Sequence, residues 1–259
     1  MILSRRLALN GQQLDELYER VVIRKIEFGE IGNTVSTVSR MGGVGQRITG
    51  DHYETMDIRL TFAINVTKRD LITRRRIYED VCAWAMQAGW LTVNFLPERR
   101  LWIDKVLIQG AGDLRDRNGE YLITFRAISV PFWQDVLPVS VTKTSYASGS
   151  FTLPVPGQFR TVAEVEFKNT SGSAITSFSI TVGGNTIALT GISLANNATL
   201  KITHENNGIL RILEGSTSVY DKRTAASADD LYADPGNRTV TLSAGGAGTL
   251  KVSVRGRYA

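Results

Sequence analysis

The chain has 259 residues, of which 42% are hydrophobic and 21% are charged, and its formal net charge is +5. Such a composition is typical of a globular protein with one large domain or two ordinary ones. The net charge is divided almost evenly between the two halves, with 19 basic and 17 acidic residues in 1–135 and 11 and 8 in 136–259. The charge therefore excludes a separate basic domain for nucleic acid.

Alternating apolar residues predict the first strands at residues 21–28, 35–38 and 53–66. The third segment is apolar at every second position from Met56 to Val66, which is the period of a half-buried strand. We expect this third strand to be the longest.

A glycine-rich stretch, residues 45–50, precedes that strand with the glycine spacing of a phosphate-binding loop. Such a loop requires Lys and then Ser or Thr after its second glycine, where this chain has Asp51 and His52. A carboxylate at this place would repel phosphate, and a strand follows instead of a helix. We therefore predict no nucleotide site and interpret residues 45–51 as a turn with positive φ at Gly50.

The period changes after residue 66. Residues 67–70 resemble a capping box with Asp70 in place of the usual Glu. Apolar residues then lie along one helical face: Ile77, Val81, Trp84, Ala85 and Ala88. A helix is predicted over residues 70–88, ending at Gly89. The basic run at residues 74–76 lies inside it, and we interpret this run as a solvated face or a salt-bridged rim.

Further strands are predicted at residues 91–95, 101–108 and 121–128, the first two paired and separated by residues 97–99. A polar loop over residues 109–119 precedes the last of them. The chain then reaches Phe132 and Trp133, where we place a domain boundary that gives domains 1–134 and 135–259. We expect Phe132 and Trp133 to pack between these domains.

The composition changes at this boundary, since all four tryptophans lie before residue 134 and the remainder is rich in Ser, Thr, Gly, Asn and Ala. Alternation predicts short strands that include 161–167, 178–182 and 250–254. Residues 183–185 and 206–208 fit tight turns that need φ above zero, and a helical turn is possible only near 228–231. This pattern indicates a β-sandwich. The predicted fold class is mainly β, with an α+β first domain that contains one helix.

No catalytic constellation is found in the sequence. The two histidines, His52 and His204, lie in no nucleophile motif, and together with Cys82 they are too few for a zinc site. We interpret Cys82, which lies beside Val81 and Trp84 on the predicted helix, as a core residue. Asp113 and Asp116 could form a carboxylate pair for glycoside hydrolysis, but the Arg and Asn residues around them favour a solvated loop. We predict no enzyme, no metal and no cofactor.

Neither export nor membrane insertion is predicted. Arg5 and Arg6 precede only three apolar residues, which is too few for a signal peptide. Nothing approaches the roughly 20 apolar residues of a membrane span. We expect the chain to be made in the cytosol.

Four segments, taken in order, resemble the distal tail proteins of long-tailed (siphovirus) bacteriophages. These segments are the glycine-bearing stretch 45–51 with the strand at 53–62, the helix at 70–88, the strand ending at 128–133, and the terminal residues 234–240 followed by 250–258. The likeness spans nearly the whole chain, and it rests on order and spacing more than on individual residues.

This resemblance implies that residues 1–134 form a β-rich hub module that assembles into a hexameric ring, and that residues 135–259 form a galectin-like sandwich on its outside. It implies no enzymatic activity. The ring would join the tail-tube protein to the tail-tip or fibre-bearing protein and leave a channel through which DNA passes as cargo. The protein would lie in the virion, at the phage tail tip, after synthesis in the host cytoplasm.

Closed rings need head-to-tail interfaces, and edge strands are natural pairing surfaces. We therefore expect the ring or partner interface within residues 40–66 and 91–108. The candidate residues are Arg47, Gly50, Asp51, Arg99, Arg100 and Trp102. Packing in the core is an open alternative for Trp102 and for Trp133.

The leading alternative function is a carbohydrate-binding module for host adhesion that acts through the sandwich. Sugar rings are commonly held against exposed aromatic faces. The second half has no Trp, and most of its Phe residues fall at core-like strand positions. Its aromatic candidates are the tyrosines at 146, 220, 232 and 258.

Overall fold

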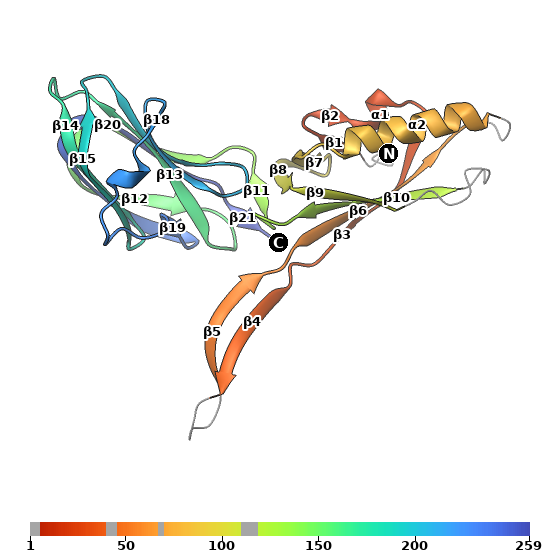
Figure 1. Cartoon of the computed structure of the whole chain (residues 1–259), viewed down its shortest axis with the longest axis horizontal. Helices are drawn as coiled ribbons and strands as arrows, with labels where there is room; N and C mark the ends of the chain where they lie inside the picture. The colour runs from red at the N-terminus through yellow and green to blue at the C-terminus, as the bar shows by residue number, and fades with distance from the viewer. Residues whose placement is uncertain (1–5, 40–45, 67–69, 110–118) are drawn as a thin grey trace. The chain divides into compact units, whose positions relative to one another are not determined.

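The computed structural model describes residues 6–39, 46–66, 70–109 and 119–259, and for residues 33–39 and 46–52 it describes the backbone alone. The chain forms two compact units, Met1–Trp133 with Ala259, and Gln134–Tyr258. The sequence analysis placed the boundary after residue 134. Strands predominate in both units, so the predicted mainly-β class is confirmed (Figure 1).

Unit 1 consists of one long helix and several short antiparallel sheets. Its elements in chain order are β1 (Leu7–Leu9), β2 (Gln12–Gln13), α1 (Leu14–Leu17), β3 (Val21–Phe28), β4 (Asn33–Ser39), β5 (Gln46–Tyr53), β6 (Met56–Ile64), α2 (Leu71–Ala85), β7 (Gly89–Val93), β8 (Leu96–Ile103), β9 (Lys105–Gln109) and β10 (Glu120–Ala127). One sheet has the order β2-β1-β7-β8, and a second has the order β3-β6-β10-β9. β4 and β5 form a separate two-stranded sheet. A short strand, β11 (Trp133–Asp135), crosses the unit boundary.

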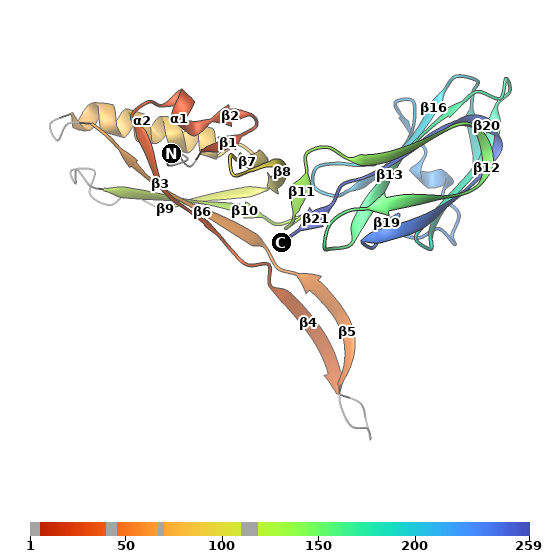
Figure 2. The same ribbon diagram turned by 180° about the vertical axis from the view of Figure 1, so that it is seen from behind.

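Helix α2 packs on the β3-β6-β10-β9 sheet, and both views show it along β6 and β10 (Figures 1 and 2). Trp84 of α2 meets Phe125 of β10 edge to face, with ring centroids 6.2 Å apart. Six residues before Trp84 on the helix, the ring of Tyr78 contacts that of Tyr121, with ring centroids 5.0 Å apart. The face that the sequence predicted is buried at Val81, Trp84 and Ala85, whereas Ala88 is exposed beyond the helix end.

The ends of α2 differ from the prediction. Asp70 is itself the N-cap, because its Oδ1 accepts a hydrogen bond of 3.0 Å from the Thr73 backbone N–H. Residues 67–69 lie outside the described residues. The helix ends at Ala85, and Gly89 already begins β7. Asn10 holds residues 88–90 beside β1, because its side chain donates a hydrogen bond to the carbonyl of Ala88 and accepts one from the N–H of Trp90. A Cβ on Gly89 would lie 1.9 Å from Asn10 Oδ1, so this contact requires glycine.

The residues of the basic run 74–76 in α2 lie in different environments, with Arg74 buried and Arg75 in a surface salt bridge. Arg74 is only 1% exposed and donates to the carbonyl of Val66, so the predicted solvated face is wrong at this position. Arg75 forms the predicted kind of surface salt bridge, to Glu79 at 2.8 Å. The sequence did not separate the two because a long cationic side chain can bury its apolar stem while its head meets a carbonyl.

Three strand predictions in unit 1 need correction. The stretch 46–53 is the strand β5 and not a turn, and Gly50 is opposite Ser36. Residues 97–99 belong to β8, and the β7–β8 turn falls at residues 94–95. The predicted strand 101–108 breaks at Asp104, because its carboxylate accepts hydrogen bonds from the backbone N–H groups of Ile128 and Ser129 and from the Ser129 hydroxyl.

Unit 2 is built from β-strands around one apolar core. Its elements are β12 (Val139–Val155), β13 (Thr161–Asn169), β14 (Ile175–Val182), β15 (Asn185–Leu194), β16 (Thr199–His204), β17 (Leu210–Glu214), β18 (Thr217–Ser218), η1 (Tyr220–Lys222), β19 (Tyr232–Ala233), β20 (Gly236–Val254) and β21 (Arg257–Tyr258). The short helical turn therefore falls at residues 220–222, not at 228–231. β20, with 19 residues, is longer than the strand expected to be the longest.

Two predicted hairpin turns of unit 2 are confirmed. Gly183 and Gly184, with φ of 55° and 93°, connect β14 to β15 between the paired residues Val182 and Asn185. This is the backbone that a two-residue hairpin turn with two positive φ values requires. Gly208, with φ of 82°, lies in the turn between β16 and β17.

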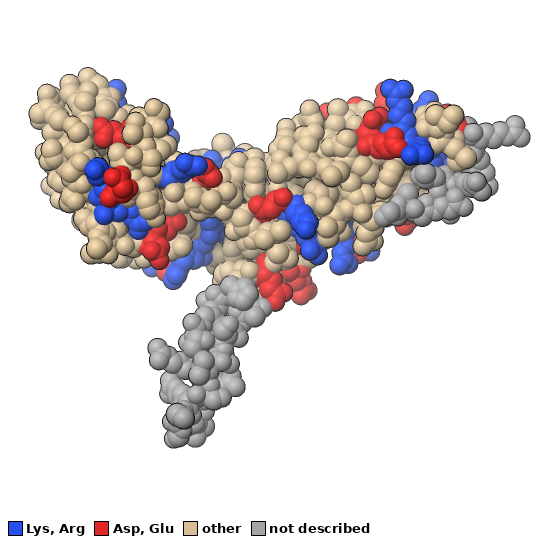
Figure 3. Space-filling model, viewed as in Figure 1, with Lys and Arg blue, Asp and Glu red and all other residues tan. Residues whose placement is uncertain are grey.

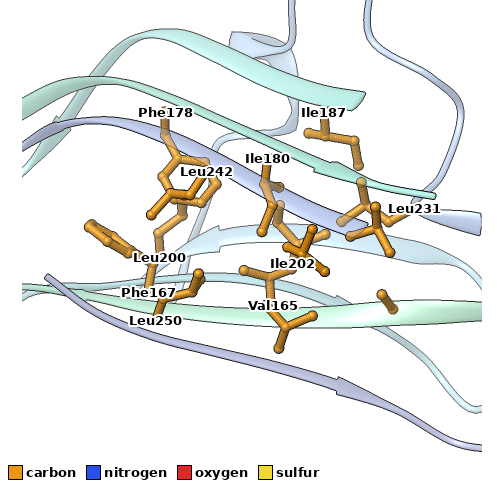
Figure 4. Close-up of a cluster of buried hydrophobic side chains, with 14 of the residues drawn as sticks. Val165, Phe167, Phe178, Ile180, Ile187, Leu200, Ile202, Leu231, Leu242 and Leu250 are labelled. Carbon is orange, nitrogen blue, oxygen red and sulfur yellow. The ribbon is translucent and has the colours of Figure 1, made fainter. Parts of the chain in front are cut away.

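The long strand β20 belongs to both layers of unit 2. Residues 240–244 pair with β14, and residues 248–254 pair with β13. Between these two segments the sequence is Gly245-Gly246-Ala247, so small residues mark the place where the strand changes partner. The layers enclose a core in which the rings of Phe167 and Phe178 lie 5.2 Å apart (Figure 4).

Replacing Gly248 by Ala should destabilise unit 2, because the new Cβ would lie 2.4 Å from Phe167 Cζ and 2.5 Å from the carbonyl oxygen of Lys168. We expect a loss of about 1–3 kcal/mol in the free energy of unfolding, the usual cost of overpacking. Gly245→Ala is the matched control, since its Cβ would meet nothing closer than 3.4 Å. Urea unfolding followed by circular dichroism compares the two, and equal stabilities would contradict the packing argument.

Asp70 should make the stability of unit 1 depend on pH. Hydrogen bonds from the Thr73 side chain and backbone lower the pKa of Asp70. The ionised cap therefore stabilises the fold above the ordinary pKa of an aspartate, and this stabilisation disappears as the pH falls through the lower folded value. Asp70→Ala should lower the melting temperature at neutral pH. Asp70→Asn keeps a cap without a titration, so its difference from the natural chain should shrink below about pH 4. A difference that does not change with pH would contradict this assignment.

Candidate assembly surface

Unit 1 contains a two-stranded sheet, formed by β4 and β5, that is separate from its other sheets. We call this sheet the arm. Its antiparallel register runs from Asn33 opposite Tyr53 to Ser39 opposite Gln46. Within the described residues, neither strand pairs with any other strand. Each strand of the arm therefore has one edge of unpaired backbone N–H and C=O groups, and a two-stranded sheet of this kind is only marginally stable alone in water.

Three predicted interface residues lie on this arm. Arg47, Gly50 and Asp51 all belong to β5, where Arg47 is opposite Val38 and Asp51 is opposite Val35. The strand runs through all three positions, with a shift of the pairing register between Ile48 and Gly50. These positions thus belong to a strand with an unpaired edge and not to a glycine turn.

The arm begins at a narrow root where two backbones approach closely. The N–H of Gly29 donates to the carbonyl of Asp57, and the N–H of Glu54 donates to the carbonyl of Gly32, each at 2.7 Å. A Cβ on Gly29 would lie 2.8 Å from the carbonyl oxygen of Asp57. Glycine is needed here because it allows the β3–β6 pair to continue into the β4–β5 pair.

Aromatic rings surround this root. Phe28, the last residue of β3, lies 5.5 Å from Phe95 and 5.8 Å from Trp133 between ring centroids. Tyr53, the last residue of β5, meets Phe132 edge to face at 4.9 Å. Phe132 and Trp133 are almost fully buried, whereas Phe28, Phe95 and Tyr53 are about two-fifths exposed.

The two residues predicted to pack between domains thus contact the ends of β3 and β5 within unit 1. The sequence analysis missed Phe28, Phe95 and Tyr53. An aromatic residue in a hairpin turn, as at Phe95, was the available signal, because turns usually carry small or polar residues.

The other three predicted residues lie on β8 and divide between its faces. Trp102 is directly opposite Trp90 of β7, with ring centroids 5.2 Å apart, and the Arg100 guanidinium lies 3.7 Å from the centre of the Trp90 ring. All three side chains are half-buried. Strand alternation places Arg99 on the opposite face, the one that buries Leu101. Trp90 is therefore a further candidate interface residue beside Arg100 and Trp102. Arg99 lies on the other face of β8.

The outer face of the β3-β6-β10-β9 sheet carries charges of both signs. Lys25 pairs with Glu27 at 2.6 Å, and Arg126 pairs with Asp57 at 3.1 Å. A hydrogen bond from Lys25, with Arg59 nearby, lowers the pKa of Glu27. Basic and acidic side chains are likewise interspersed over the visible surface in Figure 3. This face lacks the single-sign field expected of a nucleic-acid groove.

Of the residues considered for catalysis, the structure describes the side chains of His204 and Cys82, which belong to different units. The ring of His204 lies inside unit 2, where its Nε2 is 2.9 Å from both carboxyl oxygens of Asp230. Cys82 is half-buried, and burial raises the pKa of its thiol, which therefore stays protonated at neutral pH. Asp113 and Asp116 lie outside the described residues, as does the side chain of His52.

No group of three His, Cys, Asp or Glu residues that could hold a metal ion occurs within the described ranges. In the part of the chain that the structure describes, no helix is long and apolar enough to cross a membrane.

Comparison with solved structures places the fold. The chain is similar to the SPP1 Dit (gp 19.1) protein, described as a paradigm of the hub adsorption apparatus in phages that infect Gram-positive hosts, with a TM-score of 0.69 and 13% identity over 97% of this chain and 98% of that one. Chains of the phage P2 baseplate in its activated conformation align over 97% of both chains, with TM-scores of 0.48 with Ca and 0.46 with Sr, at 6% and 8% identity. No protein-family model and no curated protein matches the sequence.

The structural likeness covers nearly all of both chains, so the two proteins share a fold that includes both units. The resemblance drawn from the sequence to distal tail proteins is thereby confirmed at the level of the fold.

Shortening the arm should leave unit 1 folded. Replacing residues 34–52 by Asn-Gly keeps the paired residues Asn33 and Tyr53 on either side of a two-residue turn, and it retains the root. Because β4 and β5 pair only with each other among the described strands, we expect the melting temperature to change little. The contrasting variant is Trp133→Ala, which empties a site only 2% exposed and should cost about 3–5 kcal/mol. Unfolding of the shortened chain under native conditions would contradict this view of the arm.

Proposed function

We propose that this protein is a structural distal tail protein of a siphovirus-type bacteriophage. In this proposal, six copies of unit 1 form a ring at the end of the tail tube, and unit 2 is a galectin-like sandwich outside the ring. One side of the ring binds the tail-tube protein and the other binds the tail-tip or fibre-bearing protein. The central channel passes DNA as cargo without reading its sequence.

The observation that carries this proposal is the full-length fold likeness to the SPP1 Dit protein, which includes both units. A fold by itself hosts many functions, so the surface must support the role as well. The arm supports it, because its two open strand edges are suited to pairing with another chain. The mixed charges of the outer sheet face agree with DNA as cargo and not as a bound ligand.

Ring formation requires a heterologous contact in which one surface of a copy binds a different surface of the next. The arm supplies one such surface as unpaired backbone. The aromatic residues Trp90 and Trp102, with Arg100, supply a second of the composition that is enriched at protein interfaces. A hub needs no catalytic group, which is consistent with a non-enzymatic role.

The test is native mass measurement and electron microscopy of the purified chain, alone and with its arm shortened. We expect six-membered rings with a central hole for the natural chain, and monomers for the shortened variant at the same concentration. Trp102→Ala with Arg100→Gln should weaken assembly less than removal of the arm, because it leaves the backbone edge intact.

Rings of unchanged size and yield from the shortened variant would remove the arm from the interface. A natural chain that stays monomeric at high concentration, even when mixed with tail tubes, would contradict the hub.

Carbohydrate binding through unit 2 is the second candidate, and the exposure of two aromatic rings favours it. Tyr220 is 47% exposed and Tyr232 is 37% exposed. However, a guanidinium already lies near each ring, with Arg223 at 4.8 Å from Tyr220 and Arg160 at 5.9 Å from Tyr232. A glycan array with the natural chain and a Tyr220→Ala, Tyr232→Ala variant decides this point: sugar binding that the variant loses would establish a sugar site at these two rings.

A further inference from the structure

The turn between β16 and β17 contains the exposed dipeptide Asn207-Gly208. Gly208 has φ of 82°, and its backbone nitrogen has no neighbouring Cβ to shield it. The Asn207 side chain donates from Nδ2 to Glu205 Oε2 at 3.3 Å and accepts at Oδ1 from the Ile209 N–H at 3.1 Å. The Gly208 N–H donates to the Glu205 carbonyl at 2.8 Å. Among the described residues, every hydrogen bond of this dipeptide therefore stays within residues 205–209.

This dipeptide holds a nucleophile and a carbonyl group side by side. The Gly208 backbone nitrogen follows Asn207 directly in the chain, so attack on the side-chain carbon Cγ would close a five-membered ring. The negative charge that develops on Oδ1 during this attack would be stabilised by the Ile209 N–H, which already donates to that oxygen. Because the turn is exposed, water reaches the amide group that must leave.

We propose that Asn207 is a modification site at which the chain deamidates itself. In this reaction the Gly208 nitrogen gives its proton to water and forms a bond to Cγ of Asn207. The Cγ–Nδ2 bond breaks, and ammonia leaves with a proton taken from water. A second water molecule then opens the cyclic imide at one of its two carbonyl groups. Residue 207 becomes an aspartate or, where the main chain now runs through the side chain, an isoaspartate.

The dipeptide Asn10-Gly11, in the turn between β1 and β2, is chemically the same but is anchored differently. Asn10 Nδ2 donates to the carbonyl of Ala88 at 3.3 Å, and Asn10 Oδ1 accepts from the N–H of Trp90 at 3.0 Å. These bonds join residues that lie 78 and 80 positions apart in the chain, and ring closure would break both of them. The structure thus protects this asparagine and leaves the one in unit 2 open to reaction.

The new carboxylate would change the surface of unit 2 without unfolding it. Its neighbour Glu205 carries a negative charge, because a hydrogen bond from Arg211 lowers the pKa of the Glu205 carboxyl. Deamidation replaces the hydrogen bond from Nδ2 to Glu205 by repulsion between two carboxylates. The flanking strands stay in place, since Ile202 and Ile212 are fully buried in the core. We therefore expect a folded product with an altered turn.

Peptide mapping by mass spectrometry tests this proposal on the full chain, incubated folded and in denaturant. Trypsin cleaves after Lys201 and Arg211 and thus releases residues 202–211 as one peptide. We expect Asn207 to react at most about tenfold more slowly in the folded chain than in the unfolded chain, since only exposed hydrogen bonds inside the turn must break. Asn10 should be slowed by about thirtyfold or more, because two hydrogen bonds to a distant segment hold its side chain.

Asn207→Gln is the matched control, because its side chain is one methylene longer and would have to close a larger ring. This variant should lose the mass gain in peptide 202–211. Equal protection of Asn207 and Asn10 in the folded chain would overturn the proposal, as would an unmodified Asn207 in the folded chain when the unfolded chain has already reacted. A mass gain that persists in the same peptide of the Asn207→Gln variant would assign the reaction to Asn206 and would also overturn it.

Discussion

The arm's unpaired strand edges are the physical constraint on which the rest of this account depends. Seven residues of β4 pair with seven of the eight residues of β5, and neither strand pairs with any other described strand. Backbone donors and acceptors on the outer edges must therefore bond to water or to another chain. An interface made from such edges gains its hydrogen bonds from the backbone, so it tolerates great sequence divergence.

Unit 1 is organised to hold the arm firmly at its root. Gly29 lets two backbones meet at Asp57, and the rings of Phe28, Trp133, Tyr53 and Phe132 surround that meeting point. The core between α2 and the sheet, which includes the contact of Trp84 with Phe125, stabilises the unit that carries this root. Because β4 and β5 pair only with each other among the described strands, we expect the arm to contribute little to the stability of unit 1. Unit 2 has a separate core, to which β20 contributes Val240, Leu242, Leu250, Val252 and Val254.

Sequence patterns predicted those features that follow from local periodicity. The alternation of β6 and β10, the buried face of α2 and the glycine turn at residues 183–184 all have a signature within a few residues. The predictions were wrong where a residue distant in sequence determines the local structure. The side chain of Asn10 binds the backbone just after the end of α2, and Asp104 interrupts a predicted strand by binding the backbone at residues 128–129. Pairing with β4 makes the glycine-rich stretch a strand. Of the candidate residues only Trp102 was predicted on a strand, whereas Arg47, Gly50 and Asp51 were expected in a turn and lie on β5. The aromatic contacts of Phe28 and Phe95 depend on tertiary packing that no local pattern encodes.

Hydrogen exchange of the arm amides, followed by mass spectrometry at low and at high protein concentration, tests the central claim most directly. If the edges are completed by another copy, amides of β4 and β5 should exchange rapidly in the dilute monomer and become protected as rings form, while amides of β6 and β10 stay protected throughout. Exchange of β4 and β5 that is equally fast in monomer and assembly would contradict the account, because the open edges would then take no part in joining the copies.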